Sequence, residues 1–197
     1  GHGLIRCAQA AVEAGADYLG TATLSEAISL REAGIKAPLL AWLLPPGEDF
    51  KRAVKLDIEL GLSSLAAFDE VNKIAGAKIH LEVESGMGRG GFSNEWPELL
   101  NRDLSNVVGI FTHLARADEP NEAQNKIQIE NFEKFIEDLK ARGLNPIRHL
   151  SNTAATLSNS HAKFDMVRVG IAMYGLSPLG RDENLKPVMK IKAKLVL

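Results

Sequence analysis

The chain has 197 residues, 45% of them hydrophobic and 24% charged, so it is long enough to bury one substantial core. Its 23 Lys and Arg residues nearly balance its 25 Asp and Glu residues, and the formal net charge of -2 excludes a strongly basic field that would attract nucleic acid or an anionic membrane. The single cysteine, Cys7, excludes a disulfide within the chain, and no signal peptide or membrane-spanning apolar run is found, which predicts a cytoplasmic protein acting on small molecules.

Helix-like and strand-like segments alternate along the whole chain. Apolar residues at helical spacing predict helices, the second of which we expect to be capped by Ser25, and short apolar runs between them predict strands. The predicted helices lie within residues 3–15, 24–34, 48–57, 65–76, 94–104 and 121–143. The seven predicted strands are centred near Tyr18, Leu39, Ile58, Ile79, Val108, Ile147 and Val167.

This alternation predicts an α/β fold with a parallel sheet covered by helices. An open doubly wound sheet and a (β/α)8 barrel both fit the pattern. We favour the barrel because polar residues recur at the carboxyl ends of several successive strands, whereas an open sheet concentrates its site at one switch point. Eight strands require one more than the seven counted, so we expect the first strand before Gly1, and residues 186–197 read as a further, alternating strand.

A glycine-rich stretch, LEVESGMGRGGF, occupies residues 81–92 and contains a single cation, Arg89. Its glycines allow positive φ angles and close approach of a ligand to the backbone. The stretch lacks the Gly-Lys-Ser/Thr ending of a P-loop, and no helix follows it at the spacing of a dinucleotide fingerprint. It is therefore either a ligand-binding loop built around Arg89 or a surface turn with a solvated arginine.

Two further stretches place polar groups at strand ends. His113 ends the strand in GIFTHLARAD and is either a structural or a catalytic histidine. In RHLSNTAAT, Ser151, Asn152 and Thr153 stand where a helix begins, so they either cap that helix or help its amino terminus bind a phosphate.

Arg168 lies inside FDMVRVGIAMYG, a run that otherwise reads as a buried strand. Burying an unpaired guanidinium is costly, so Arg168 must either reach water or meet a polar partner. In barrels the backbone after the seventh and eighth strands commonly holds a phosphate, which predicts that Thr153 and Gly170 converge on one anion. The five histidines form no HxH or HExxH pattern and no GxSxG motif occurs, so neither a metal site nor a serine nucleophile is predicted.

The motifs YLGTAT, SGMGR, THLARAD, HLSNTAAT and VRVGIAMYGLSP follow one another in this order, and with them the chain resembles the alanine racemase family over essentially its whole length. The resemblance implies a pyridoxal-phosphate-binding (β/α)8 barrel in a homodimer. It also implies the conversion of L-alanine to D-alanine through a pyridoxal-phosphate aldimine, which supplies D-alanine for peptidoglycan.

The resemblance assigns roles to particular residues. Arg168 matches the arginine that donates to the pyridine nitrogen of the cofactor, where most pyridoxal enzymes place a carboxylate. Arg89 matches the arginine that contacts the phenolic oxygen of the cofactor and the carboxylate of the substrate, and His113 matches a supporting histidine near the reaction. The cofactor-binding set implied by the family is His149, Asn152, Thr153, Arg168, Gly170 and Ile171.

The family's two proton-transferring bases, a lysine and a tyrosine, match no position in this chain. We therefore expect residues 1–184 to be a partial barrel, residues 185–197 to begin a C-terminal β domain, and the 197-residue chain alone to be inactive. Glu82 stands where many relatives carry a carbamylated lysine, and we hypothesise that its carboxylate orients Arg89. The alternatives are a barrel-only pyridoxal-phosphate carrier and a barrel enzyme acting on phosphorylated sugars.

Overall fold

Six strands and the helices between them alternate along residues 2–194, which are the residues that the computed structural model describes. The strands are β1 (Leu19–Thr21), β2 (Leu39–Ala41), β3 (Ile58–Leu62), β4 (Ile79–Glu82), β5 (Val107–Phe111) and β6 (Ile147–His149). The α-helices are α1 (Leu4–Glu13), α2 (Leu24–Glu32), α3 (Phe50–Lys55), α4 (Leu65–Val71), α5 (Trp96–Leu99), α6 (Ala123–Ala141) and α7 (Thr153–Ser158). Two 3-10 helices follow, η1 (Ser160–Ala162) and η2 (Ile171–Tyr174).

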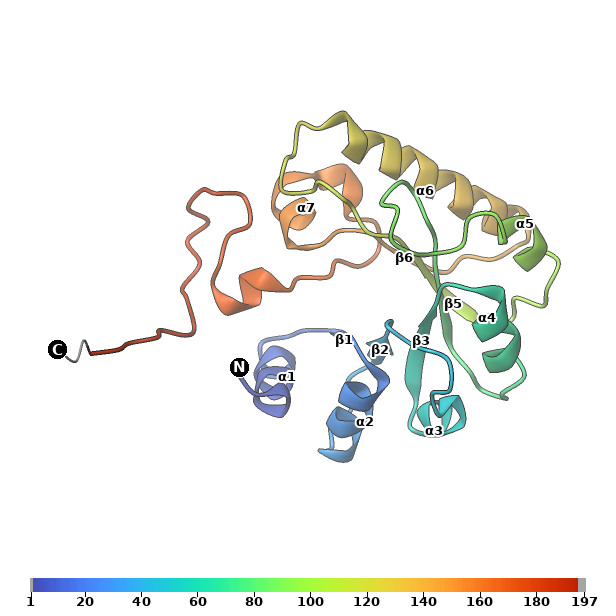
Figure 1. The fold of residues 1–197 in the computed structure, drawn as a ribbon, viewed down its shortest axis with the longest axis horizontal. Helices are drawn as coiled ribbons and strands as arrows, with labels where there is room; N and C mark the ends of the chain where they lie inside the picture. The colour runs from blue at the N-terminus through green and yellow to red at the C-terminus, as the bar shows by residue number, and fades with distance from the viewer. Residues whose placement is uncertain (1, 195–197) are drawn as a thin grey trace.

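Every strand pairs in parallel with the strand next to it in sequence, giving the order β1-β2-β3-β4-β5-β6. A doubly wound sheet reverses its strand order at a switch point, and this sheet has none. Figure 1 shows the helices along the outside of the curved sheet. The structure therefore confirms a parallel α/β fold of half-barrel form.

The two faces of the sheet differ in chemistry. On β3, Ile58, Leu60 and Leu62 face outward into the apolar core beneath the helices. Glu59 and Gly61 alternate with them and face inward, because successive side chains of a strand point to opposite faces. Glu59 is nevertheless only 5% exposed, so the inner side of the sheet buries a carboxylate.

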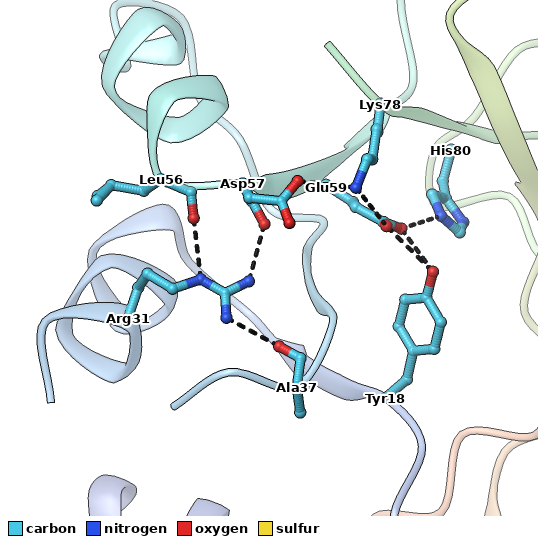
Figure 2. A network of polar contacts seen from close by, with 8 residues as sticks. All are labelled: Tyr18, Arg31, Ala37, Leu56, Asp57, Glu59, Lys78 and His80. Atoms are coloured by element: carbon cyan, nitrogen blue, oxygen red, sulfur yellow. Dashed lines mark hydrogen bonds and ion pairs between the residues drawn. The ribbon is translucent and has the colours of Figure 1, made fainter. Parts of the chain in front are cut away.

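The starts of β2 and β3 are held by Arg31 of α2. Its guanidinium donates to the carbonyl oxygens of Ala37 (2.9 Å), Leu56 (2.9 Å) and Asp57 (2.8 Å), as Figure 2 shows. Asp57 has a positive φ of 53°, which a non-glycine residue rarely adopts. The three contacts fix the loop that sets the start of β3, and hence the register of its inward-facing residues.

The predicted cap of the second helix is wrong by two residues. Thr23, not Ser25, is the N-cap: its Oγ1 accepts from the Glu26 backbone N–H at 3.3 Å, and a Glu26 carboxylate oxygen accepts from the Thr23 N–H at 3.1 Å. This reciprocal pair is a capping box, which satisfies two otherwise unpaired donors at once.

The seventh predicted strand, near Val167, does not form. The segment makes a single parallel bridge between Met166 and His149. The carboxylate of Asp165 accepts from the backbone N–H of Arg148 at 2.9 Å, so a side chain takes the donor that a seventh strand would have used. The ladder therefore ends after one bridge.

The predicted strand over residues 186–197 is also absent as far as Lys194, and residues 195–197 lie outside the described residues. In Figure 1 this segment runs away from the sheet, and Ile191 is 88% exposed. Alternating apolar residues do not form a strand without a neighbour that accepts their backbone hydrogen bonds. Within residues 2–194, no helix combines the length and apolar character needed to cross a bilayer.

Candidate active site

A cleft of about 1400 Å³ opens on the inner side of the sheet and reaches the carboxyl ends of the strands. Polar groups that follow β4, β5 and β6 meet there, as expected for parallel strands that share one edge. All but one of the predicted site residues line this cleft: Arg89, His113, Asn152, Thr153, Arg168, Gly170 and Ile171. His149 is fully buried and is not one of the residues that line the cleft.

The guanidinium of Arg168 has the polar partners that its position in an apolar run demanded. Nη1 donates to the carbonyl oxygen of His149 at 2.9 Å and lies 2.9 Å from its Nδ1, while Nη2 donates to the carbonyl oxygens of Thr112 (2.7 Å) and Leu150 (3.2 Å). Nε makes no hydrogen bond to the described residues, and Arg168 is one of the residues that line the cleft. One donor of this firmly held cation is therefore not used by the described part of the chain.

Burial lowers the pKa of Arg168 to about 10, with Glu82 opposing this change and Arg89 adding to it. The side chain thus stays charged at neutral pH. The guanidinium also lies 5.5 Å from the ring centroid of Phe111, within the range of a cation–π contact.

Two imidazoles flank Arg168. Nδ1 of His113 is 3.3 Å from Nη2, and burial, then Arg168 and Arg89, lower the pKa of His113 to about 4. His149 is stacked on Phe111, with ring centroids 5.0 Å apart, and burial, Arg168 and His80 lower its pKa. Both rings are therefore neutral at neutral pH, so each can accept a hydrogen bond from Arg168.

Thr153 and Gly170 lie side by side, and their convergence on one anion remains a prediction. The Gly170 backbone N–H donates to Thr153 Oγ1 at 2.9 Å, although the two residues come from separate segments. Asn152 is the N-cap of α7, since its Oδ1 accepts from the Ala155 N–H at 3.1 Å, so the capping alternative for Asn152 is confirmed. Ile171 is 44% exposed at the start of η2.

Arg89 lies in a loop built around Glu84. The Glu84 carboxylate accepts from four successive backbone N–H groups, from Gly86 to Arg89, at 2.5 to 3.2 Å. Gly86 and Gly88 have φ angles of 132° and 72°, which explains the glycines. The side chain of Arg89 is exposed, and the loop presents it to the cleft.

Glu82 makes no hydrogen bond or ion pair with Arg89 among the residues that the structure describes. Burial raises the pKa of Glu82, and Arg89 and Arg168 oppose that effect. Both arginines therefore act on Glu82 through their charge. No direct contact between Glu82 and Arg89 supports the hypothesis that Glu82 orients Arg89.

Three polar residues near the site were not predicted from the sequence. Glu59 accepts from the Tyr18 hydroxyl at 3.0 Å and lies 2.8 Å from Nε2 of His80, and Nδ1 of His80 lies 2.8 Å from Nε2 of His149. The signal that could have identified Glu59 and His80 is the one that marked Arg168, an ionisable residue inside an apolar strand. In the described part of the chain, no group of three or more His, Cys, Asp or Glu residues could hold a metal ion.

Comparison with known proteins identifies relatives of this chain. Residues 1–178 match the family described as alanine racemase, N-terminal domain. The chain is 42% identical to alanine racemase of Salinispora tropica and 44% identical to that of Thermobifida fusca, in each case over 100% of this chain and 57% of the relative. The crystal structure of alanine racemase from Streptomyces lavendulae superposes with a TM-score of 0.90 at 38% identity, over 95% of this chain and 54% of that one. The chain spans little more than half the length of these relatives, and it belongs to the alanine racemase family.

Proposed function

We propose that the protein containing this chain interconverts L- and D-alanine with pyridoxal phosphate bound in the cleft at the carboxyl ends of the strands. The observation that best supports this proposal is Arg168, a cation at the cleft that is held by three carbonyl oxygens and a neutral imidazole and whose Nε is not used by the described residues. Relatives of nearly twice this length bear the name alanine racemase, which supports the same activity.

The residues present fit this cofactor. A pyridine nitrogen is an acceptor, and Nε of Arg168 is a donor that the described residues leave unused. Thr153, Gly170, Asn152 and Ile171 all line the same cleft. The Thr153 hydroxyl accepts from the Gly170 backbone N–H and keeps its own proton, which a phosphate oxygen could accept. A Cβ added at Gly170 would meet no atom within 4 Å, so the backbone there is open to a ligand.

Pyridoxal phosphate supplies an electron sink for the charge that develops at the α-carbon of a bound amino acid. Arg168, with a pKa of about 10, donates a hydrogen bond at neutral pH without giving up its proton. Arg168 would therefore leave a bound pyridine nitrogen unprotonated, so that the group would withdraw less charge from the α-carbon. This role of Arg168 suits a racemase, in which the proton must return to the α-carbon.

Arg89 and His113 complete the proposed site. Arg89 extends from the glycine loop into the cleft as an exposed cation, suited to an amino-acid carboxylate. His113 is neutral and touches Arg168, so we assign it a supporting role in keeping that guanidinium in place.

The remaining parts of the proposal concern the whole protein. We propose that residues 1–184 belong to a (β/α)8 barrel, that residues 185–197 begin a β domain, and that the lysine and tyrosine bases lie outside this chain. We further propose a cytoplasmic homodimer with shared active sites that supplies D-alanine for peptidoglycan. A barrel enzyme acting on phosphorylated sugars would need an acid or a lysine base at a strand end, for which Glu82 and Glu84 are the close candidates. Four backbone N–H groups already bind the Glu84 carboxylate.

The test is racemisation itself. The full-length protein, supplied with pyridoxal phosphate and L-alanine, should form D-alanine, measured by chiral chromatography. The 197-residue chain alone should be at least about a thousandfold slower, because it lacks the two groups that transfer the α-proton. Cofactor binding by the full-length protein without racemisation would support the carrier alternative, and racemisation by the chain alone at the full rate would contradict the assignment of the bases.

A further inference from the structure

A continuous chain of hydrogen bonds crosses the inner side of the sheet and ends on Arg168. It runs from Glu59 on β3 to His80 on β4, then to His149 on β6, and from there to the guanidinium, with successive distances of 2.8, 2.8 and 2.9 Å. Figure 2 shows its first part, where Tyr18, His80 and Lys78 all point at the Glu59 carboxylate. The four residues come from four separate segments of the fold.

The chain is buried along its length. His80 and His149 are 0% exposed, and Glu59 is 5% exposed. In such a place an unpaired donor or acceptor costs free energy, so each ring nitrogen must have a suitable partner. Because of this requirement, the distances show which ring nitrogen carries the proton in each histidine.

The donors and acceptors can be assigned from the two ends. Arginine can only donate, so Nδ1 of His149 must be an acceptor, and the proton of the neutral ring is on Nε2. That Nε2–H donates to Nδ1 of His80, whose own proton is then on Nε2 and is donated to the Glu59 carboxylate. All three bonds are satisfied in one direction, with both rings neutral.

The opposite direction fails at Arg168. A proton on Nδ1 of His80 would force His149 to accept at Nε2 and to carry its proton on Nδ1, facing a guanidinium that cannot accept. A carboxylate at the far end prevents this, because it accepts from His80 and cannot donate. The Tyr18 hydroxyl holds the carboxylate, and burial, followed by the charge of Glu59, raises the pKa of Tyr18, so this hydroxyl remains a donor.

We infer that Glu59 is a positioning residue for Arg168: acting through His80, it fixes His149 in the tautomer whose Nδ1 accepts from the guanidinium. The inference rests on the proposed function only for its catalytic consequence. The direction of the hydrogen bonds is a property of the protein alone. Neither Glu59 nor His80 lines the cleft, so their effect on Arg168 must pass through His149.

The decisive measurement is the tautomer of each histidine, by 15N NMR of the full-length protein with labelled histidine, before any cofactor is added. In the wild type, both His80 and His149 should carry their proton on Nε2 at neutral pH. A doubly protonated ring, or a proton on Nδ1 of His149, would overturn the inference whether or not the protein is a racemase.

The variant that tests Glu59 is Glu59→Gln, since an amide can donate to His80 as well as accept. It should produce a second His149 signal with the proton on Nδ1, and kcat for alanine should fall about tenfold, the loss of one charge-assisted hydrogen bond, with a smaller change in KM. The matched control is Glu133→Gln, at an exposed position on α6, which should change neither the His149 signal nor kcat. Unchanged His149 signals and kcat in Glu59→Gln would refute the role.

Tyr18→Phe covers the case in which Glu59→Gln does not fold. It removes one hydroxyl that donates to the carboxylate and leaves the charge in place, so a smaller share of the same second His149 signal is expected. A wild-type His149 spectrum in that variant would count against the inference. If racemisation is absent from the wild type, the proposed function fails while the tautomer results still stand.

Discussion

Gly109, on the inner face of β5, illustrates how single residues make room for the polar interior of this fold. A Cβ at this position would lie 1.9 Å from Nδ1 and 2.3 Å from Cε1 of His80. Real Cβ atoms do not approach so closely, so the imidazole lies where only a hydrogen atom can face it. Glycine usually weakens a strand, but at this position the packing of the His80 ring requires it.

Gly109→Ala should therefore displace His80 and lower the free energy of unfolding by about 1–3 kcal/mol, the usual cost of overpacking a filled interior. Urea denaturation of the full-length protein measures this. Gly90→Ala is the matched control, because a Cβ there meets no atom within 4 Å and its φ is not positive, so it should be close to neutral. Equal stability of the two variants would show that His80 can move aside at no cost.

The glycine loop after β4 is the clearest case at the scale of an element. Its shape depends on the Glu84 carboxylate, which four backbone N–H groups bind. Burial alone would raise the pKa of Glu84, but these four hydrogen bonds outweigh burial and lower it. Because the folded pKa is depressed, the carboxylate stabilises the loop above its unfolded pKa, and this stabilisation is lost as the pH falls through the folded pKa.

Glu84→Gln should loosen the loop that carries Arg89, since a neutral amide offers one oxygen where two charged oxygens accepted four bonds. Hydrogen exchange at the backbone of residues 86–89 should become faster by about tenfold, the equivalent of one lost charge-assisted hydrogen bond. Mass spectrometry of the exchanged peptides reports this directly. With Glu133→Gln as the control, an unchanged exchange rate in Glu84→Gln would mean that the glycines alone hold the loop.

For the whole molecule, the buried neutral histidines make stability depend on pH. The pKa of His113 falls from 6.5 in the unfolded chain to about 4 in the folded state. Between these values the unfolded chain binds a proton that the folded chain does not, so stability falls as the pH falls from 6.5 to about 4. His149, whose pKa is also lowered, acts in the same direction.

The variant His113→Asn should remove about 2 kcal/mol of this pH dependence, less than the full shift implies because the ring is partly exposed and screened. The comparison is urea unfolding of the variant and the wild type across that pH window. His161→Asn, at an exposed position in η1, is the control and should keep the wild-type slope. If the free energy of unfolding of the variant changed with pH as steeply as that of the wild type, His113 would not be the cause of the pH dependence.

Much of the fold and several residues of the cleft could be predicted from the sequence. The alternation of helical and extended patterns predicted a parallel α/β sheet, because burial on both faces leaves a local signature in each strand. Thr153 and Gly170 were predicted to meet because parallel strands end at one edge, and Arg89, His113 and Arg168 were placed at the site by the family resemblance; all five line one cleft. Local patterns failed where a side chain replaced a backbone partner, as Asp165 does at the predicted seventh strand.

The sequence by itself determined the class of fold, the edge of the sheet that carries the cleft and the charge at Arg168 that needed a partner. Only the tertiary structure decided which partners it has. Glu59, His80 and His149 lie on three different strands, and their hydrogen bonds depend on the register and curvature that bring those strands together. A buried charge is visible in the sequence because it violates a local pattern, whereas the groups that satisfy it are set by contacts between distant segments.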